Sequence, residues 1–182
     1  MGIVVDVVGY GRRSVARQRE VQQRLFAVMA GIPDAVGVDP ERVRVAGGLG
    51  DGMVLLFPPE IDVTRVLPRL VRAMAERVDA DNRRYRDRMR IRLAAGFGLA
   101  GRGPLGHVGS SVLELSRLND SPPARRAMID RENADLVVVV SHLLYQLIDR
   151  CGRCADDLPP LKPVTVSVKE YYSTAWMWIC EG

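Results

Sequence analysis

Two acidic residues stand where a strand and a turn could bring them together. Asp6 interrupts the apolar run IVVDVV at residues 3–8, and Asp51 lies in the glycine-rich stretch GGLGDGMVLLF at residues 47–57. An unpaired charge in a buried strand is costly, so a buried acid is usually paired or bound to a metal. Oxygen ligands of this kind favour magnesium or manganese. Carboxylates that accept hydrogen bonds from turn amides are the alternative.

The metal interpretation requires that the two segments be neighbouring strands. Residues 3–10 are apolar on both faces, which is typical of a central buried strand. Residues 42–46 alternate polar and apolar side chains and predict a hairpin with residues 53–57. The Asp-Gly pair at the turn tolerates the positive φ that a tight turn demands. We therefore expect Asp51 in a hairpin beside the first strand.

The rest of the chain alternates between helical and strand-like patterns. Helices are predicted from Ser14 to Gly31, over residues 62–86, from the capping box Ser111-Val-Leu-Glu114 to Leu118, after the turn at residues 120–122, and after residue 141. Strands are predicted over residues 89–100 and 134–141 and as two closing strands after residue 162, with a loop over residues 101–106. This order predicts one α/β (α+β) sandwich spanning residues 1–182 as a single domain.

Composition narrows the function classes. The 182 residues carry a net charge of +4, but the arginines are interspersed with carboxylates and only 5% of residues are aromatic, so no nucleic-acid partner is expected. No apolar run approaches the ~20 residues of a membrane span. Three cysteines and the absence of a signal-like N-terminus predict a cytoplasmic protein.

Three blocks in order resemble a known family. IVVDVVGYGRR, GLGDGMVLLF and RIRLAAGFGLAGRGPLGHVGSSVLELSRL, followed by VSVKEYYSTAW, are similar to the catalytic domain of class III nucleotidyl (adenylate and guanylate) cyclases, and especially to small divergent actinobacterial ones. The resemblance implies a ferredoxin-like βαββαβ core with a C-terminal β-hairpin. It also implies formation of a 3′,5′-cyclic nucleotide from a nucleoside triphosphate.

The resemblance assigns the metal ligands. Asp6 stands at the first metal aspartate, the backbone carbonyl of Val7 is an additional ligand, and Asp51 stands at the second aspartate. Two Mg²⁺ or Mn²⁺ ions would lower the pKa of the ribose 3′-hydroxyl and neutralise charge on the α-phosphate for in-line attack.

The resemblance also assigns phosphate contacts. The amides of Gly9, Tyr10 and Gly11, between strand and helix, would face the triphosphate. Arg117 matches the arginine that stabilises charge on the transferring phosphate, and Lys169 matches a basic residue that touches the terminal phosphates. Family sites form between two chains, with metal-binding residues from one and the arginine and base-reading residues from the other. A head-to-tail homodimer, or a heterodimer with another cyclase-like chain, is therefore implied.

The base and ribose positions depart from the family pattern. Leu113 replaces the asparagine that orients the ribose, and Gly47 replaces the lysine that reads the purine. Gly106 stands at the partner base-reading position, with His107 one residue away. Strict base selection is hard to build without polar groups at these positions. The sequence thus leaves two hypotheses: a cyclase that is weak or of relaxed base specificity, or a degenerate regulatory module that binds nucleotide or a partner in bacterial signalling or conflict systems.

Three further features carry less weight. The CGRC stretch at residues 151–154 (Cys151 and Cys154) has no second pair of zinc ligands, so we expect it to be incidental, with a zinc or redox site as the alternative. Trp176 and Trp178 share one face of the last strand, which predicts core packing or, alternatively, a dimer surface. The tyrosine pair at residues 171–172 is expected in the preceding turn.

Overall fold

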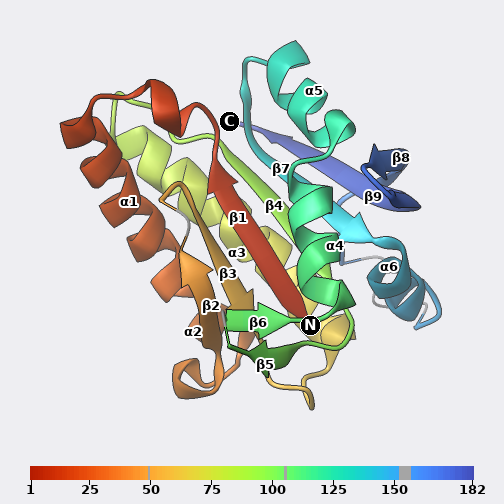
Figure 1. The fold of residues 1–182 in the computed structure, drawn as a ribbon. Coiled ribbons are helices and arrows are strands. Elements are labelled where there is room, and N and C mark those ends of the chain that lie inside the picture. Colours follow the sequence, from red (N-terminus) through yellow and green to blue (C-terminus); the bar gives the residue numbers. More distant parts are fainter. Residues whose placement is uncertain (49, 105, 152–156) are drawn as a thin grey trace.

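Seven strands form one mixed sheet at the centre of the molecule (Figure 1). The computed structural model describes residues 1–48, 50–104, 106–151 and 157–182. The sheet has the order β2-β3-β1-β4-β7-β9-β8, and β5 pairs with β6 in a separate two-stranded ribbon. The strands are β1 (Gly2–Val7), β2 (Arg44–Gly48), β3 (Gly52–Leu56), β4 (Ile91–Gly96), β5 (Gly101–Gly103), β6 (Gly106–Val108), β7 (Ala134–Ser141), β8 (Lys162–Val168) and β9 (Tyr171–Glu181).

Helices cover both faces of the sheet (Figure 1). Helices α1, α2, α3 and α6 pack in one apolar cluster on one face, and α4 and α5 pack in a second cluster on the other. The helices are α1 (Val15–Ala30), α2 (Ile32–Val36), α3 (Val63–Arg84), α4 (Ser110–Asn119), α5 (Pro122–Asp130) and α6 (His142–Asp149), with 3₁₀ turns η1 (Tyr10–Arg12) and η2 (Pro40–Arg42). In the described part of the chain, no helix is long and apolar enough to cross a membrane.

The predicted ferredoxin-like core is confirmed by the arrangement of the first four sheet strands. Strands β2, β3, β1 and β4 are neighbours in that order, and β1 pairs antiparallel with both β3 and β4. Side chains alternate along β1: Ile3, Val5 and Val7 enter the cluster on the α1 and α3 face, whereas Val4 packs against the α4 and α5 cluster. Because strand side chains alternate between faces, Asp6 points to the α4 side of the sheet.

Most helix starts follow the side-chain capping rule. Ser14, Ser121 and Ser141 each accept a hydrogen bond from the backbone N–H three residues later, and Asp62 caps α3 through Thr64. These residues satisfy amides that have no partner inside the helix.

The predicted capping box of α4 is wrong. The helix starts at Ser110 after Gly109, which has φ 136° and gives no side-chain cap. The Ser111 hydroxyl donates instead to the carbonyl of Leu99 at 2.6 Å, and Glu114 accepts a hydrogen bond from Tyr171 at 2.8 Å. Both side chains that the local pattern assigned to the cap thus form tertiary hydrogen bonds instead.

Two loop assignments also change. Part of the loop predicted over residues 101–106 is the β5–β6 ribbon, in which Gly101 pairs with Val108. The tyrosines at residues 171–172 belong to β9 rather than to the turn, because the turn closes at Lys169 and Glu170. Lys169 has φ 52°, the left-handed conformation that such a tight turn requires.

Candidate functional site

The pairing of β1 with β3 places the two predicted metal aspartates together. Asp6 lies opposite Gly52 in the strand register, and the Val7 N–H donates to the carbonyl of Asp51 at 2.9 Å. Asp6 and Asp51 line one hollow of about 160 Å³, which we call the aspartate hollow. The predicted hairpin of β2 and β3 therefore does bring Asp51 beside the first strand.

The turn that carries Asp51 is built differently from the expected Asp-Gly turn. Gly50 holds the left-handed conformation, with φ 68°, whereas Asp51 and Gly52 are not in that region. Gly52 is needed for another reason: a Cβ atom there would lie 2.4 Å from the backbone carbonyl oxygen of Val5. Glycine at this position lets β3 approach β1 closely, next to both aspartates.

Asp6 is held by an arginine that the sequence analysis did not single out. Arg92 on β4 lies opposite Asp6, and its Nε and Nη2 atoms donate to the two carboxylate oxygens at 3.0 and 2.5 Å. Burial raises the pKa of Asp6, the hydrogen bond and charge of Arg92 lower it, and the charges of Asp51 and Asp120 raise it again. The net effect is a pKa above the ordinary value, in which burial is the largest cause.

The end of α4 supplies further polar groups to the aspartate hollow. Ser116, Asn119 and Asp120 line it together with the two aspartates. Asn119 is 3% exposed, and its Oδ1 atom has no hydrogen-bond partner among the described residues. The sequence alone gives little indication that Asp120 lies near Asp6, because this placement depends on how α4 crosses the sheet.

The oxygen atoms of Asp6 and Asp51 suit a hard divalent cation. Among the residues that the structure describes, Asp51 has no hydrogen bond or ion pair from its carboxylate, so its oxygens are available. No group of three or more His, Cys, Asp and Glu side chains in the described part is close enough to hold a metal ion. The donors that fit are therefore the two aspartates and the predicted Val7 carbonyl, and the Asp6 oxygens are the ones that Arg92 now contacts.

The segment after β1 presents free amides. Val8 donates its N–H to Arg90, but the N–H groups of Gly9, Tyr10 and Gly11 donate to no residue that the structure describes. Gly9 has φ 72°, which turns the chain into η1. The Tyr10 ring lies beside Gly50, 4.0 Å from where a Cβ atom on that glycine would be. These amides and the Asp51 turn therefore lie close together.

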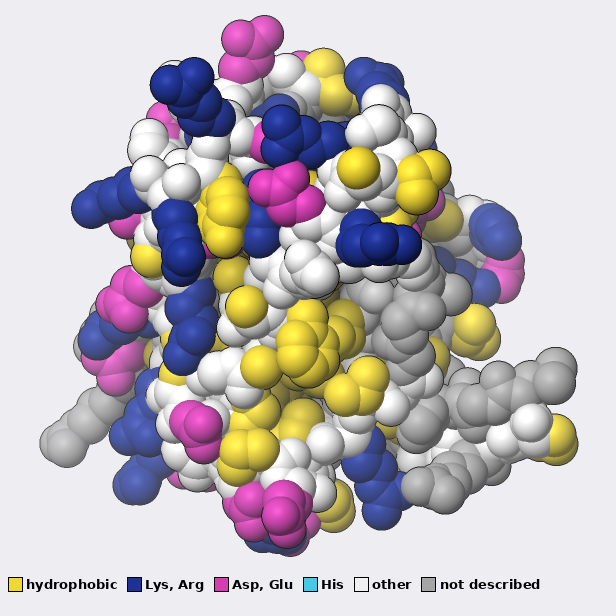
Figure 2. Space-filling model, turned by 90° about the vertical axis from the view of Figure 1, so that its left-hand side faces the viewer, with side chains coloured by type: hydrophobic (Ala, Val, Ile, Leu, Met, Phe, Trp, Pro, Cys, Tyr) yellow, Lys and Arg dark blue, Asp and Glu magenta, His cyan; other side chains and the backbone are white. Residues whose placement is uncertain are grey.

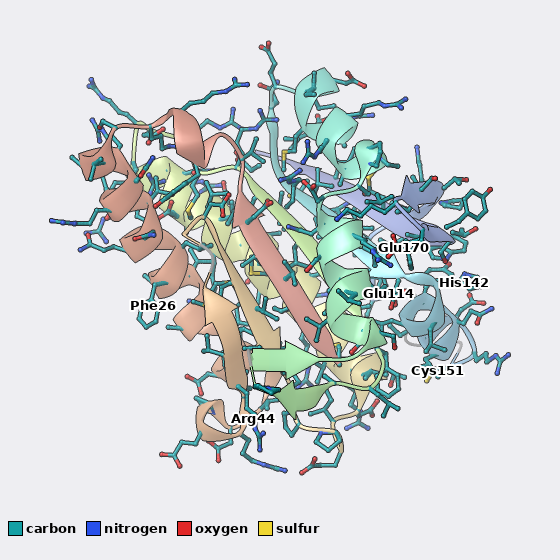
Figure 3. All side chains as sticks on the ribbon, in the orientation of Figure 1. Phe26, Arg44, Glu114, His142, Cys151 and Glu170 are labelled. Atoms are coloured by element: carbon teal, nitrogen blue, oxygen red, sulfur yellow. The ribbon has the colours of Figure 1, made fainter. Side chains whose placement is uncertain are left out.

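Arg117 contacts the turn that carries Lys169 and does not line the aspartate hollow. Arg117 on α4 forms an ion pair with Glu170 of the β8–β9 turn, and its guanidinium lies 5.9 Å from the centre of the Tyr171 ring. Figure 3 labels Glu170 in this turn and Glu114 on α4. Burial, followed by the hydrogen bond to Glu114, raises the pKa of Tyr171 to about 12. Arg117 is not among the residues that line the aspartate hollow.

Solved structures show what fold this arrangement belongs to. The guanylate cyclase domain of RhGC from Catenaria anguillulae, solved with GTP, is 18% identical with a TM-score of 0.66, covering 99% of this chain and 94% of that one. The adenylate/guanylate cyclase/hydrolase from Silicibacter pomeroyi is 18% identical with a TM-score of 0.65, covering 100% and 96%. The adenylyl cyclase CyaB from P. aeruginosa is 13% identical with a TM-score of 0.62, covering 100% and 93%.

The chain has the fold of the class III nucleotidyl cyclase catalytic domain. No protein-family model matches the sequence, and no curated protein matches it. The likeness therefore lies in the three-dimensional arrangement of the strands and helices.

The positions that depart from the cyclase pattern lie on α4, β2 and β6. Leu113 is 58% exposed on α4. Gly47 is a β2 residue opposite Val54, next to a bulge that follows Val45. Gly106 and His107 belong to β6. Residues 49 and 105, beside two of these positions, lie outside the described residues.

Two remaining predictions have different outcomes. Trp176 and Trp178 pack against the core cluster on the α1 and α3 face, and the Trp176 ring stacks on Tyr145 with a centroid distance of 3.6 Å. Core packing of this pair is thus confirmed. The second cysteine of the CGRC stretch, Cys154, lies outside the described residues, so the zinc or redox alternative stays a prediction.

Proposed function

We propose that residues 1–182 form one nucleotidyl cyclase-like domain that converts a nucleoside triphosphate to a 3′,5′-cyclic nucleotide and pyrophosphate in the cytoplasm. The observation that carries this proposal is the meeting of Asp6 and Asp51 in one hollow at the paired ends of β1 and β3, within a cyclase fold. Asp51 keeps its carboxylate free of partners among the described residues, although it lies near the charge of Asp6. Two neighbouring carboxylates attract a divalent cation.

Different residues of the chain would bind the metal ions and the phosphates in this reaction. Asp6, Asp51 and the Val7 carbonyl would hold Mg²⁺ or Mn²⁺, which supplies Lewis acidity when bound. The free N–H groups of residues 9–11 would donate to phosphate oxygens. The ribose 3′-hydroxyl loses its proton to water and bonds to the α-phosphorus, while the bond from that phosphorus to the bridging oxygen breaks and pyrophosphate leaves with the electron pair.

A second chain would complete the site. Arg117 and Lys169 would neutralise charge on the transferring and terminal phosphates, yet within one chain Arg117 contacts Glu170 rather than the aspartate hollow. A head-to-tail homodimer, or a heterodimer with another cyclase-like chain, would bring Arg117 of one chain to the aspartates of the other. Figure 2 shows the side of the molecule that carries α1 and β2, where hydrophobic side chains gather among charged ones. Exposed Phe26 and Val45 on these elements fit a contact surface.

The alternative function is a degenerate cyclase-homology domain that binds nucleotide or a partner without turnover. Two ion pairs favour it, because Arg92 occupies the oxygens of Asp6 and Glu170 pairs with Arg117. Leu113 and Gly47 also favour it, since neither side chain can contact a ribose or a base through a hydrogen bond. The two functions differ in whether a cyclic product forms.

The test incubates the purified chain with each of ATP, GTP, CTP and UTP in the presence of Mn²⁺ and analyses the products by mass spectrometry. Binding of each triphosphate is measured in parallel by calorimetry. Asp51→Asn is the site variant, and Asp34→Asn, which changes an exposed carboxylate on α2, is the matched control.

A cyclic product that is lost in Asp51→Asn and kept in Asp34→Asn supports the enzyme. Triphosphate binding without any cyclic product, in the parent chain, supports the degenerate module instead. A chain that neither binds a triphosphate nor makes a product contradicts the enzyme and the nucleotide-binding form of the alternative, and supports the form that binds a partner.

A further inference from the structure

The guanidinium of Arg92 lies between two carboxylates. Its Nε and Nη2 atoms contact both oxygens of Asp6, and its Nη1 atom is 3.6 Å from Oδ1 of Asp120. The side chains of Arg92 and Asp6 are 14% and 17% exposed, so this contact is largely shielded from water. A shielded ion pair is lost only if each partner finds another group of opposite charge or a hydrogen bond.

A cation at Asp6 and Asp51 competes directly with Arg92. The arginine fork uses one lone pair on each Asp6 oxygen, so a metal ion that binds Asp6 must share the carboxylate and its negative charge with the guanidinium. Binding of the ion would leave a largely buried guanidinium beside a divalent charge. The guanidinium must therefore move, and the structure offers a place for it.

The acceptors for a displaced guanidinium are at the end of α4. Asp120 already lies near Nη1, and among the described residues its other ion pair is with Arg125, whose side chain is 57% exposed. Asn119 Oδ1 is a buried acceptor that lacks a donor among the described residues, and it lines the same hollow. A guanidinium carries five N–H donors, so it can satisfy a carboxylate and an amide oxygen together.

We propose that Arg92 is a displaceable internal counter-cation, which a divalent cation at Asp6 and Asp51 transfers to Asp120 and Asn119. Asp120 is then a positioning residue that controls metal affinity through Arg92 and not as a ligand. This inference rests on the metal site of the proposed function and adds a regulator to it. The metal must overcome the Arg92 contact, so the affinity of the parent chain for metal is lower than its two aspartates alone would give.

The test measures Mn²⁺ binding by electron paramagnetic resonance without nucleotide, in the parent chain, Arg92→Met, Asp120→Asn and the double variant. Arg92→Met should bind Mn²⁺ roughly tenfold or more tightly, because the metal ion then has no charged hydrogen bonds of Arg92 to displace. Asp120→Asn should bind it several-fold more weakly, because the displaced guanidinium loses its acceptor. In the Arg92→Met background, Asp120→Asn should have almost no effect.

The double variant decides between roles for Asp120. An equal loss of Mn²⁺ affinity with and without Arg92 would show that Asp120 acts as a ligand or through its field, which overturns the proposal. Unchanged Mn²⁺ affinity in Arg92→Met, or no Mn²⁺ binding in either chain, overturns it too. Binding in Arg92→Met alone supports it, since the arginine then blocks the site fully.

A second measurement uses the unchanged protein. The side-chain Nε–H resonance of Arg92, assigned by its absence in Arg92→Lys, should shift as Mg²⁺ is added, and a resonance that stays in place contradicts the transfer. None of these readouts needs turnover. A chain that shows the Arg92 effect but makes no cyclic product refutes the enzyme alone, whereas a product without the Arg92 effect refutes this inference alone.

Discussion

Arg92 donates to both carboxylate oxygens of Asp6 across the β1–β4 pair, joining residues that are 86 positions apart in the chain. The negative charge of Asp6, the first predicted metal ligand, is thus already balanced by an arginine on the neighbouring strand. Burial still raises the pKa of Asp6, and the nearby charges of Asp51 and Asp120 add to that rise. We therefore expect this ion pair to affect both the stability of this part of the sheet and the binding of a metal ion at Asp6.

Removal of Arg92 should destabilise the protein in a pH-dependent way. Arg92→Met leaves Asp6 buried without a counter-charge, which should cost about 3 kcal/mol of unfolding free energy at pH 7.5. Loss of the arginine raises the folded-state pKa of Asp6 further above its ordinary value of 3.8. A raised carboxyl pKa favours the protonated form in the folded state, so the penalty should shrink as the pH falls towards 4.5. Urea unfolding at the two pH values measures this.

The matched control is the exposed pair of Arg83 and Asp79 on α3, in which the arginine side chain is 79% exposed. Arg83→Met should change the unfolding free energy by less than about 0.5 kcal/mol at either pH, as exposed helix pairs do. An Arg92→Met penalty that stays constant between pH 7.5 and 4.5 would contradict the role given to Asp6.

Local patterns in the sequence were enough to predict the strands of the core and the hairpin of residues 42–46 with 53–57, whereas the ferredoxin-like arrangement came from the resemblance to the cyclases. The apolar run around Asp6 and the alternation before Asp51 predict two strands, and β1 and β3 are indeed neighbours. Arg92 could have been found from its alternation on a strand, but its partner depends on the register of β1 with β4, which no local pattern gives. Asp120 was missed for a similar reason, because it follows α4 and only the packing of that helix brings it to Asp6.

The failed capping box shows the limit of local reasoning. Ser111 and Glu114 have the spacing of a cap, yet Leu99 and Tyr171 form hydrogen bonds with their side chains. A cap contributes about 1 kcal/mol, which a pair of tertiary hydrogen bonds can match. A local interaction that contributes so little free energy is replaced wherever the fold supplies another hydrogen-bond partner for the same side chain.

Release of Arg117 should strengthen triphosphate binding. The carboxylate of Glu170 pairs with Arg117 while its side chain remains 72% exposed. Glu170→Gln removes the negative charge, so Arg117 is available to a phosphate and triphosphate affinity should rise several-fold. Stability should change by less than about 1 kcal/mol because the Glu170 side chain is exposed. Calorimetry with a non-hydrolysable triphosphate measures the affinity.

Glu132→Gln is a suitable control for this effect, since Glu132 is an exposed acid before β7. An equal gain in triphosphate affinity in both variants would reflect net charge alone and would count against a specific contact of Arg117. A gain confined to Glu170→Gln supports it.

The two serine caps of α1 and α6 should differ in their contribution to stability. Ser141 is fully buried and accepts from the N–H of Leu144, whereas Ser14 is exposed and accepts from the N–H of Arg17. Water can replace the cap at Ser14 but not at Ser141. Ser141→Ala should therefore cost about 2 kcal/mol and Ser14→Ala about 0.5 kcal/mol, at the two ends of the range for caps. Equal losses in thermal or urea unfolding would contradict this.

Leu113→Asn should test whether the ribose position limits turnover. Leu113 is 58% exposed, so an amide there leaves no buried polar group unsatisfied and should change stability by less than about 0.5 kcal/mol. If the proposed reaction takes place, an asparagine can hold the ribose by hydrogen bonds that leucine cannot make. The rate of cyclic product formation should then rise several-fold, up to about tenfold, since one neutral hydrogen bond contributes about 0.5–1.5 kcal/mol. The comparison is Leu143→Asn on α6, where leucine is 47% exposed and no nucleotide contact is expected. A rate that rises equally in both variants, or in neither, would show that the leucine at residue 113 is not what restrains this site.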